Sequence, residues 1–195
     1  MSKRLFDIVF SGIGLVCLSP LFAIVALWIK IDSPGPVFFR QDRVGRNGKH
    51  FRIMKFRSMR VGSDAGSQIT IGNNDNRITK SGHVIRRLKI DELPQLINVL
   101  VGDMSFVGPR PEVSRYVRMY TEEQRRVLTM RPGITDPASI KYRNENEILG
   151  TVDNPEKYYI SVIMPDKLSI NLQYVDNHSL IGDIKIIVTT IFRVV

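Results

Sequence analysis

The first thirty residues are almost continuously apolar, and this feature limits most strongly what the chain can fold into. Between residues 5 and 29 the apolar run is interrupted only by one aspartate, by a few small residues and by the pair Ser19 and Pro20. A helix of about 20 such residues is long enough to cross the hydrocarbon core of a bilayer. We therefore predict a membrane anchor at residues 1–32 and a separately folded domain at residues 33–195.

Basic residues lie on both sides of the apolar segment. Lys3 and Arg4 precede it, and Lys30 follows it. Positive charge is typical of flanks that stay on the cytoplasmic side, so a straight crossing would place one basic flank on the wrong side. Pro20 removes a backbone hydrogen bond and bends a helix, and Ser19 can satisfy the carbonyl that is freed. Two interpretations stay open, a bent helix that re-enters the same face and a kinked helix that crosses.

The net charge of the chain limits the kinds of partner that it is expected to bind. A formal net charge of +9 favours an anionic partner, which could be nucleic acid, an acidic membrane surface or a phosphorylated small molecule. The tyrosines do not alternate with basic residues as stacking platforms for nucleic acid do, and the apolar segment also argues against that class. Cys17 is the only cysteine, so no internal disulfide can form and a reducing compartment is expected.

Two short runs of strand-forming residues, 37–42 and 51–56, flank the dipeptide Asn47-Gly48. This dipeptide favours a tight turn between antiparallel strands, so the pattern predicts a β-hairpin. Residues 62–79 are rich in Gly, Ser, Asn and Asp, and we interpret them as a long loop. Such a loop could close over a substrate, and an irregular surface segment is the simpler alternative.

The clearest helix of the folded domain lies at residues 93–101, where apolar residues recur at helical spacing. Gly102 follows as a stop. Pro94 is tolerated only in the first turn of a helix. This restriction places Asp91 and Glu92 at or just before the helix N-terminus.

The rest of the domain is predicted to be mostly helical. Pro111 is expected to open a helix that runs through Tyr120, and residues 121–124 have the capping-box pattern of a further helix. Residues 180–195 are strongly apolar but carry charges and are short for a membrane span, so we expect them to lie on the membrane surface. The predicted fold class is α+β, mostly helical, with a small antiparallel hairpin.

Asp91 and Glu92 are the carboxylates that we single out for chemistry. Adjacent residues on a helix point about 100° apart, so this pair is poorly arranged to share one proton. One carboxylate could attack an electrophile while the other holds Mg²⁺, which prefers oxygen ligands and often bridges to substrate phosphates. The alternative is structural, with Asp91 as a helix cap and Glu92 complementing the helix dipole.

Basic residues flank this pair and favour the chemical interpretation. Arg86 and two further basic residues stand just upstream, and a Gly-Pro-Arg-Pro stretch at residues 108–111 lies downstream. Arginine side chains match phosphate oxygens, and a helix N-terminus offers free backbone amides to an anion. Lys55 and Arg57 could face the same phosphates. Together these residues indicate a metal-assisted diphosphate site.

The motifs taken together resemble the small monotopic phosphoglycosyl transferases, also called bacterial sugar transferases or polyprenyl-phosphate sugar-1-phosphate transferases. The resemblance covers nearly the whole chain. The motifs that carry it are KRLFD at residues 3–7, Ser19 with Pro20, KFRSM at 55–59, DELPQL at 91–96, GDMSFVGPRP at 102–111 and RPGIT at 131–135.

The resemblance implies a two-step reaction. Asp91 would attack the β-phosphate of a UDP-sugar and expel UMP, and a polyprenyl phosphate, typically undecaprenyl phosphate, would then take the sugar phosphate from the enzyme. Glu92 would bind Mg²⁺. The residues predicted to contact the substrate or its phosphates are Lys55, Arg86, Pro109, Arg110 and Asp183. Such a reaction is the first membrane step in making an exopolysaccharide, an O-antigen or another glycoconjugate.

The resemblance also implies where the protein works. The anchor would be a re-entrant helix broken at Ser19 and Pro20, and short amphipathic helices would rest in the membrane interface. The active site would face the cytoplasm at the bacterial inner membrane. A homodimer is compatible with the resemblance, and no nucleic-acid partner is expected.

One segment departs from the family pattern. Many members continue after Pro-Gly-Ile-Thr with Gly-Trp-Ala-Gln, whereas this chain has DPAS at residues 136–139 and KYRN at residues 141–144. We therefore predict that residues 136–144 help to choose the sugar or to orient the nucleotide. Two other functions stay open, a lipid glycosyl transferase that releases UDP and a non-catalytic scaffold at the membrane surface.

Overall fold

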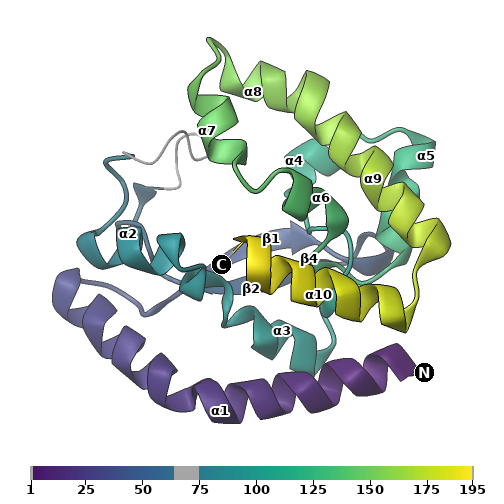
Figure 1. Ribbon diagram of the computed structural model, residues 1–195. Helices are drawn as coiled ribbons and strands as arrows, with labels where there is room; N and C mark the ends of the chain where they lie inside the picture. Colours follow the sequence, from purple (N-terminus) through teal and green to yellow (C-terminus); the bar gives the residue numbers. More distant parts are fainter. Residues whose placement is uncertain (1, 64–74, 195) are drawn as a thin grey trace.

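The computed structural model describes residues 2–63 and 75–194, which are mostly helical and contain two small sheets (Figure 1). The helices and strands in chain order are α1 (Ser2–Asp32), β1 (Phe38–Val44), β2 (His50–Phe56), α2 (Lys80–Arg87), α3 (Gln95–Val101), β3 (Ser105–Val107), α4 (Ser114–Val117), α5 (Glu122–Arg125), β4 (Gly133–Thr135), α6 (Pro137–Lys141), α7 (Glu145–Gly150), α8 (Pro155–Tyr158), α9 (Met164–Asn177) and α10 (Leu180–Val194). Short turns of 3₁₀ or π type lie at Arg46–Gly48 (η1), Ile90–Glu92 (η3), Arg126–Thr129 (η4) and Tyr159–Ile163 (η5). The mostly helical α+β prediction is confirmed.

Helix α1 runs along one side of the other elements and bends in its middle (Figure 1). By length and composition it is able to cross a membrane. Pro20 has no N–H, so it cannot bond the carbonyl of Val16, four residues earlier. The Ser19 hydroxyl donates a hydrogen bond to that carbonyl at 2.8 Å. The prediction that Ser19 satisfies a freed carbonyl is confirmed, and the helix bends here without breaking.

The N-terminal end of α1 is bonded to the domain. Arg4 donates hydrogen bonds to the carbonyls of Val99 and Leu100, at 2.6 and 2.9 Å. These carbonyls lie in the last turn of α3, where a cation is favoured by the helix dipole. Asp7 is buried and accepts hydrogen bonds from the Ser105 hydroxyl and the Phe106 N–H in β3, each at 3.1 Å. Polar groups therefore fix this end of the apolar helix.

The C-terminal end of α1 is fixed as well. Val25 and Ile29 are buried in one cluster with Phe56 of β2 and Ile85 of α2. Asp32 accepts hydrogen bonds from the backbone N–H of Ser81 at 2.9 Å and from its hydroxyl at 2.8 Å. Both ends of α1 thus contact the same folded domain.

Strands β1 and β2 form the predicted antiparallel hairpin, in a register that pairs Phe38 with Phe56 and Val44 with His50. The turn between them contains Asn47 at φ 56° and Gly48 at φ 76°. These left-handed conformations suit Asn and Gly, which explains why the dipeptide marks the turn.

A second, parallel pair joins β3 to β4, with Ser105 opposite Gly133 and Val107 opposite Thr135. The chain passes very close to itself beside this pair. A Cβ atom on Gly133 would lie only 2.2 Å from the backbone nitrogen of Gly108, so no larger residue fits there. This contact fixes the Gly-Pro-Arg-Pro stretch, residues 108–111, against β4.

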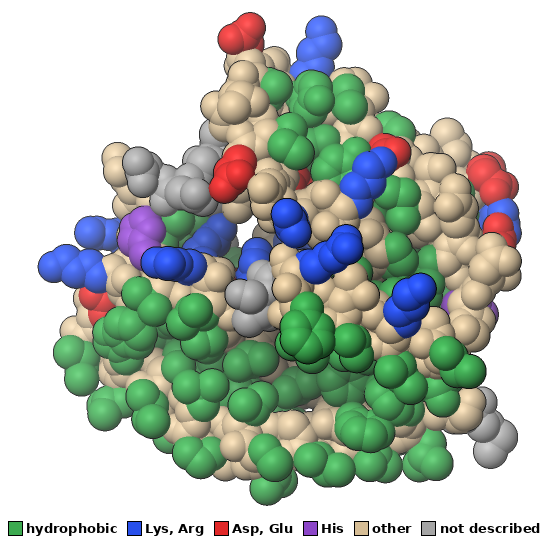
Figure 2. Space-filling view, viewed as in Figure 1, with side chains coloured by type: hydrophobic (Ala, Val, Ile, Leu, Met, Phe, Trp, Pro, Cys, Tyr) green, Lys and Arg blue, Asp and Glu red, His purple; other side chains and the backbone are tan. Residues whose placement is uncertain are grey.

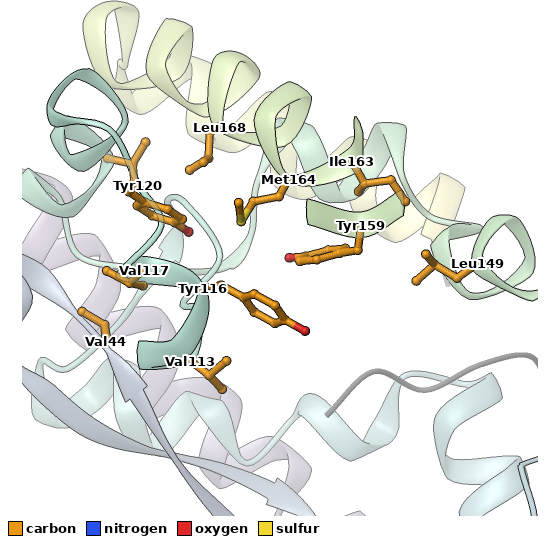
Figure 3. Close-up of a cluster of buried hydrophobic side chains, with 11 residues drawn as sticks. Val44, Val113, Tyr116, Val117, Tyr120, Leu149, Tyr159, Ile163, Met164 and Leu168 are labelled. Carbon is orange, nitrogen blue, oxygen red and sulfur yellow. The ribbon is translucent and has the colours of Figure 1, made fainter. Parts of the chain in front are cut away.

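The helices of the C-terminal half enclose the main hydrophobic core (Figure 3). Its buried members come from β1, α4 and the helices that follow. They are Val44, Val113, Tyr116, Val117, Tyr120, Val127, Leu149, Tyr159, Ile163, Met164 and Leu168. Tyr116 and Tyr159 face each other with ring centroids 5.1 Å apart.

The capping-box prediction is confirmed, since Thr121 and Gln124 exchange the two expected hydrogen bonds at the start of α5. The prediction of a helix from Pro111 through Tyr120 is wrong, because α4 covers only residues 114–117. The carbonyl of Glu112 accepts a hydrogen bond from the N–H of Val44 at 2.9 Å. This bond to the end of β1 keeps the chain extended past Pro111 and delays the helix.

The predicted long loop at residues 62–79 falls mostly on residues 64–74, which lie outside the described part of the chain. On either side of it, Met59 and Ile78 pair in a single antiparallel bridge. The suggestion that this segment closes over a substrate stays a prediction.

Candidate active site

Asp91 and Glu92 lie in the turn η3, between α2 and α3. Lys89, just before the turn, has φ 56° and ψ 17°, a left-handed conformation that is uncommon for a residue with a side chain. Such conformations are often found at functional sites. Pro94 then occupies the N-cap position of α3. The predicted location of the two carboxylates just before this helix is confirmed.

Glu92 is held by two cations. Lys55 of β2 donates a hydrogen bond to Oε1 at 2.7 Å, and Arg110 reaches both carboxylate oxygens, with the contact to Oε2 at 3.3 Å. Burial by itself would raise the pKa of Glu92, but the charges and hydrogen bonds of Arg110 and Lys55 outweigh burial and hold the pKa well below its usual range. Glu92 is therefore ionised, and each of its oxygens has a cationic partner.

Asp91 has a different environment although it is the next residue. Its side chain is buried, and Oδ1 has no hydrogen-bond partner among the described residues. Burial raises the pKa of Asp91 above its usual range, while the charges of Lys55 and Arg86 oppose that shift. A buried carboxylate with an unpaired oxygen and nearby cations has the chemistry that a nucleophile needs.

Both carboxylates line a large cleft with a volume of about 1330 Å³. Lys55, Arg86 and Arg110 line the same cleft. These five residues come from β2, α2, η3 and the stretch after β3, so the fold brings together side chains that are distant in sequence. The cleft is large enough for a nucleotide sugar and part of a second substrate.

Two of the predicted contact residues do not line this cleft. Pro109 is buried, and its carbonyl accepts a hydrogen bond from the N–H of Gly133 at 3.1 Å, so it fixes the loop that carries Arg110. Asp183 is also buried, and it accepts hydrogen bonds from Lys3 and from the Tyr174 hydroxyl, the latter at 2.6 Å. The structure thus joins Asp183 to the start of α1 and does not bring it to Asp91.

Arg57 is placed differently from its neighbour Lys55. Its guanidinium donates hydrogen bonds to the carbonyls of Ser33 and Pro34, the first at 2.8 Å. Arg57 is only 4% exposed. Its buried hydrogen bonds therefore fix the chain just after α1. Its role is mainly structural, although one side of it borders the cleft.

Sequence reasoning missed several residues that line the cleft, among them Arg43, Glu112 and Tyr159. The Tyr159 hydroxyl donates a hydrogen bond to Glu112, and Arg43 forms an ion pair with the same carboxylate at 3.7 Å. Tyr159 lies in the π turn η5, a local irregularity that often marks functional sites. No local pattern links these residues, because they meet only in the folded chain.

The segment that departs from the family pattern has two roles in the fold. Asp136 is fully buried and caps α6 by accepting hydrogen bonds from the N–H groups of Ala138 and Ser139, at 2.9 and 3.1 Å. Tyr142 and Asn144, a few residues later, line the cleft. Asp136 is thus structural, and the predicted influence on sugar choice stays a prediction that concerns the later residues.

The donor set fits Mg²⁺ only together with a phosphate ligand. Within residues 2–63 and 75–194 no three His, Cys, Asp or Glu side chains are grouped to hold a metal. Both oxygens of Glu92 have partners, whereas no residue in the described ranges bonds Oδ1 of Asp91. Mg²⁺ is commonly bound by one or two carboxylates with waters and substrate phosphates, and this pair can supply that share of its ligands.

Comparison with known proteins decides the family. The family model described as bacterial sugar transferase matches residues 1–195, the whole chain. The chain is a member of the bacterial sugar transferase family. The family membership predicted from the motifs is therefore confirmed.

Several relatives of this bacterial sugar transferase carry functional names. UDP-glucose:undecaprenyl-phosphate glucose-1-phosphate transferase of Escherichia coli is 39% identical over 194 residues, which are 98% of this chain and 39% of the relative. Exopolysaccharide production protein PSS of Rhizobium leguminosarum is 40% identical over 197 residues, 97% of this chain and 92% of the relative. ExoY of Rhizobium meliloti, also an exopolysaccharide production protein, is 34% identical over 206 residues, 98% and 84%. The chain spans about two fifths of the Escherichia coli relative and most of the other two.

Proposed function

We propose that this protein transfers a sugar 1-phosphate from a UDP-sugar to a polyprenyl phosphate through a covalent adduct on Asp91. The observation that carries the proposal is the buried, unpaired Oδ1 of Asp91 in a cleft that Lys55, Arg86 and Arg110 also line. A relative named for glucose-1-phosphate transfer to undecaprenyl phosphate, and others named for exopolysaccharide production, agree with this reaction class.

In the first step a carboxylate oxygen of Asp91 attacks the β-phosphorus of the UDP-sugar. A new P–O bond forms to Asp91, the bond from that phosphorus to the bridging oxygen breaks, and UMP leaves with the bonding electrons. Lys55, Arg86 and Arg110 stabilise the charge that develops on the phosphate oxygens. Burial of Asp91 favours attack because a desolvated carboxylate has few hydrogen bonds to give up.

In the second step a phosphate oxygen of the polyprenyl phosphate attacks the phosphorus held on Asp91. The bond to the Asp91 oxygen breaks, and the carboxylate is regenerated as the polyprenyl diphosphate sugar forms. The covalent route means that the soluble donor and the lipid acceptor do not have to react directly with each other.

Glu92 serves this reaction without becoming the nucleophile. Its two oxygens are engaged by Lys55 and Arg110, and its low pKa marks it as a weak base. Glu92 and Asp91 are the residues that would hold Mg²⁺ together with the donor diphosphate. The metal, when bound, would neutralise part of the diphosphate charge and assist the departure of UMP.

We propose further that α1 enters and leaves the same face of the membrane. Its two ends are bonded to one domain, through Arg4 and Asp7 at one end and Asp32 at the other. A crossing helix would separate its ends by the roughly 30 Å hydrocarbon core, and the domain would have to reach both sides. Figure 2 shows hydrophobic side chains gathered where α1 lies, with Lys and Arg side chains above them. This arrangement suits a domain resting at the inner membrane and facing the cytoplasm.

A labelling experiment tests this topology. In a Cys17→Ser background, single cysteines at Ser2 and at Lys49, both exposed positions, should react with a membrane-impermeant thiol reagent from the same side of sealed vesicles. Labelling from opposite sides would show that α1 crosses.

Product analysis tests the chemistry. With a UDP-sugar and a polyprenyl phosphate, the purified protein should release UMP and form a polyprenyl diphosphate sugar. Release of UDP would favour a lipid glycosyl transferase, and no turnover with any UDP-sugar would favour a non-catalytic scaffold. A requirement for Mg²⁺ should appear as loss of UMP release with EDTA and its recovery with added Mg²⁺.

A further inference from the structure

The large cleft has one wall that is apolar. This wall is formed by the end of η3, by α3, by the parallel pair β3 and β4, and by α10. Its apolar members are Leu93, Leu96, Phe106, Ile134, Ile187 and Ile191. Basic residues from other elements also line the cleft, among them Lys55, Arg60, Arg86 and Arg87. Asp91 and Glu92 directly precede Leu93 in the chain and line the same cleft.

The apolar wall continues onto the outer surface along α10. Ile191 lines the cleft and is also 57% exposed. One and two turns earlier on the same helix, Val188 and Ile184 are exposed as well. Figure 1 shows α10 lying above α3 and the first half of α1, next to the hydrophobic side of the molecule in Figure 2. An apolar path therefore leads from the cleft to the surface that we assign to the membrane.

Helix α10 is held in place by polar contacts. Thr190 shares a hydrogen bond of 2.6 Å with Thr135 of β4. Near the start of the helix, the buried carboxylate of Asp183 is bonded to Tyr174 of α9 and to Lys3 of α1. These contacts fix the register of α10, so Ile187 and Ile191 form a defined wall.

We propose that this wall, with Ile187 and Ile191 at its centre, binds the isoprene units next to the phosphate of the acceptor lipid. The proposal rests on the proposed function. A polyprenyl phosphate is apolar at one end and dianionic at the other, which matches a cleft lined by a continuous set of apolar residues and by basic residues. The UDP-sugar does not match the apolar wall, because its hydroxyl and phosphate groups would lose hydrogen bonds there.

The test compares two acceptors that differ only in chain length, undecaprenyl phosphate and geranyl phosphate, in the same detergent. Ile187→Asn and, separately, Ile191→Asn should raise the KM for undecaprenyl phosphate about tenfold. This is the effect of losing a branched apolar side chain that the bound lipid would cover. The KM for geranyl phosphate should change less, because the shorter chain covers less of the wall. Ile191 is largely exposed, so its variant should fold normally.

The matched control is Ile181→Asn on the same helix, because Ile181 is 82% exposed and does not line the cleft. This variant should leave both KM values within about twofold. If Ile181→Asn raises them as much as Ile187→Asn does, the residues act through general membrane binding and the proposal is overturned. Equal changes with long and short acceptors in the Ile187 variant would overturn it too.

Formation of the adduct from UDP-sugar alone keeps this proposal separate from the proposed function. The Ile187 and Ile191 variants should form the adduct on Asp91 at the wild-type rate, because the donor does not touch the apolar wall. A slowed adduct step in these variants would assign the wall to the donor and contradict the proposal. Absence of an adduct in the wild-type protein would instead contradict the function on which the proposal rests.

Discussion

Asp91 and Glu92 are adjacent carboxylates in the η3 turn, yet their surroundings are opposite in kind. On one side Glu92 is bonded to Lys55 and Arg110, and its pKa lies well below the usual range. On the other side Asp91 is buried with an unpaired oxygen, and its pKa is raised. One carboxylate is thus stabilised in its charged form by its partners, whereas burial disfavours the charged form of the other and the charges of Lys55 and Arg86 oppose that effect. The difference agrees with the roles that we propose, Glu92 as the residue that organises charge and Asp91 as the nucleophile.

The same contrast explains which neighbours each residue needs. Arg110 is held close by the short loop that Pro109 and Gly133 fix, so the cation over Glu92 has little freedom. Among the described residues, Asp91 Oδ1 has no bonded partner, so a phosphate or a metal ion that reaches it has no hydrogen bond to displace. The following predictions change one side of the turn at a time.

Asp91→Asn should have the largest effect on activity and the opposite effect on stability. We expect UMP release to fall at least about 10³-fold, because the attacking oxygen is removed. The free energy of unfolding should rise by about 1 kcal/mol, since an ionised group no longer has to be buried. The measurements are a UMP-release assay and urea unfolding. Asp42→Asn, at an exposed position, is the control and should change neither quantity appreciably.

Glu92→Gln should lower both activity and stability. It leaves Lys55 and Arg110 without their counter-charge, and these side chains are only 20% and 33% exposed. We expect the free energy of unfolding to fall by about 2 kcal/mol and UMP release to fall about 10²-fold. Glu123→Gln removes an exposed ion pair with Arg126 and should change the free energy of unfolding by less than about 0.5 kcal/mol. A Glu92→Gln protein more stable than the wild type would contradict the claim that Lys55 and Arg110 stabilise ionised Glu92.

The two variants should respond oppositely to pH. The raised pKa of Asp91 gives stability that is present below its unfolded pKa and lost as pH rises through the folded pKa, so the Tm advantage of Asp91→Asn should widen from about pH 4 upward. The lowered pKa of Glu92 gives stability that is present above its unfolded pKa and lost as pH falls through the folded pKa. The Tm deficit of Glu92→Gln should therefore shrink in acid. Thermal scans from about pH 2 to 8 measure both trends, because the Glu92 contribution is lost only below its unfolded pKa. Parallel trends in the two variants would argue against the assignment.

Arg110→Lys should have the smallest effect, because it keeps the positive charge and loses only the two-pronged contact with Glu92. We expect UMP release to fall about tenfold and the free energy of unfolding to fall by about 1 kcal/mol. Arg118→Lys, at an exposed position, should leave both unchanged. If Arg110→Lys lowered UMP release and the free energy of unfolding as much as Glu92→Gln, the geometry of the contact with Glu92 would matter more than its charge.

Local patterns predicted the parts of the fold that depend on local chemistry. The hairpin follows from Asn47 and Gly48, which adopt the left-handed conformations that the turn requires. The hydrogen bond from Ser19 to the carbonyl freed by Pro20 involves residues within one turn of a helix. The position of Asp91 before α3 follows from Pro94, which a helix accepts only at its start.

Contacts between residues far apart in the sequence could not be predicted from local patterns. In the sequence Lys3 is one of the basic residues that flank the apolar segment. In the structure it forms an ion pair with Asp183, close to the other end of the chain. That pairing takes Asp183 away from the position at Asp91 that the family resemblance implies. Pro111 likewise fails to start a helix because the next residue bonds to Val44 of β1.

The most direct test of a reactive Asp91 is the mass of the intact protein after incubation with a UDP-sugar and Mg²⁺ in the absence of lipid. The wild-type protein should gain the mass of one sugar phosphate, located by fragmentation to Asp91, and Glu92→Gln should gain it more slowly. Asp91→Asn should gain nothing. An adduct on another residue, or normal turnover by Asp91→Asn, would contradict the account.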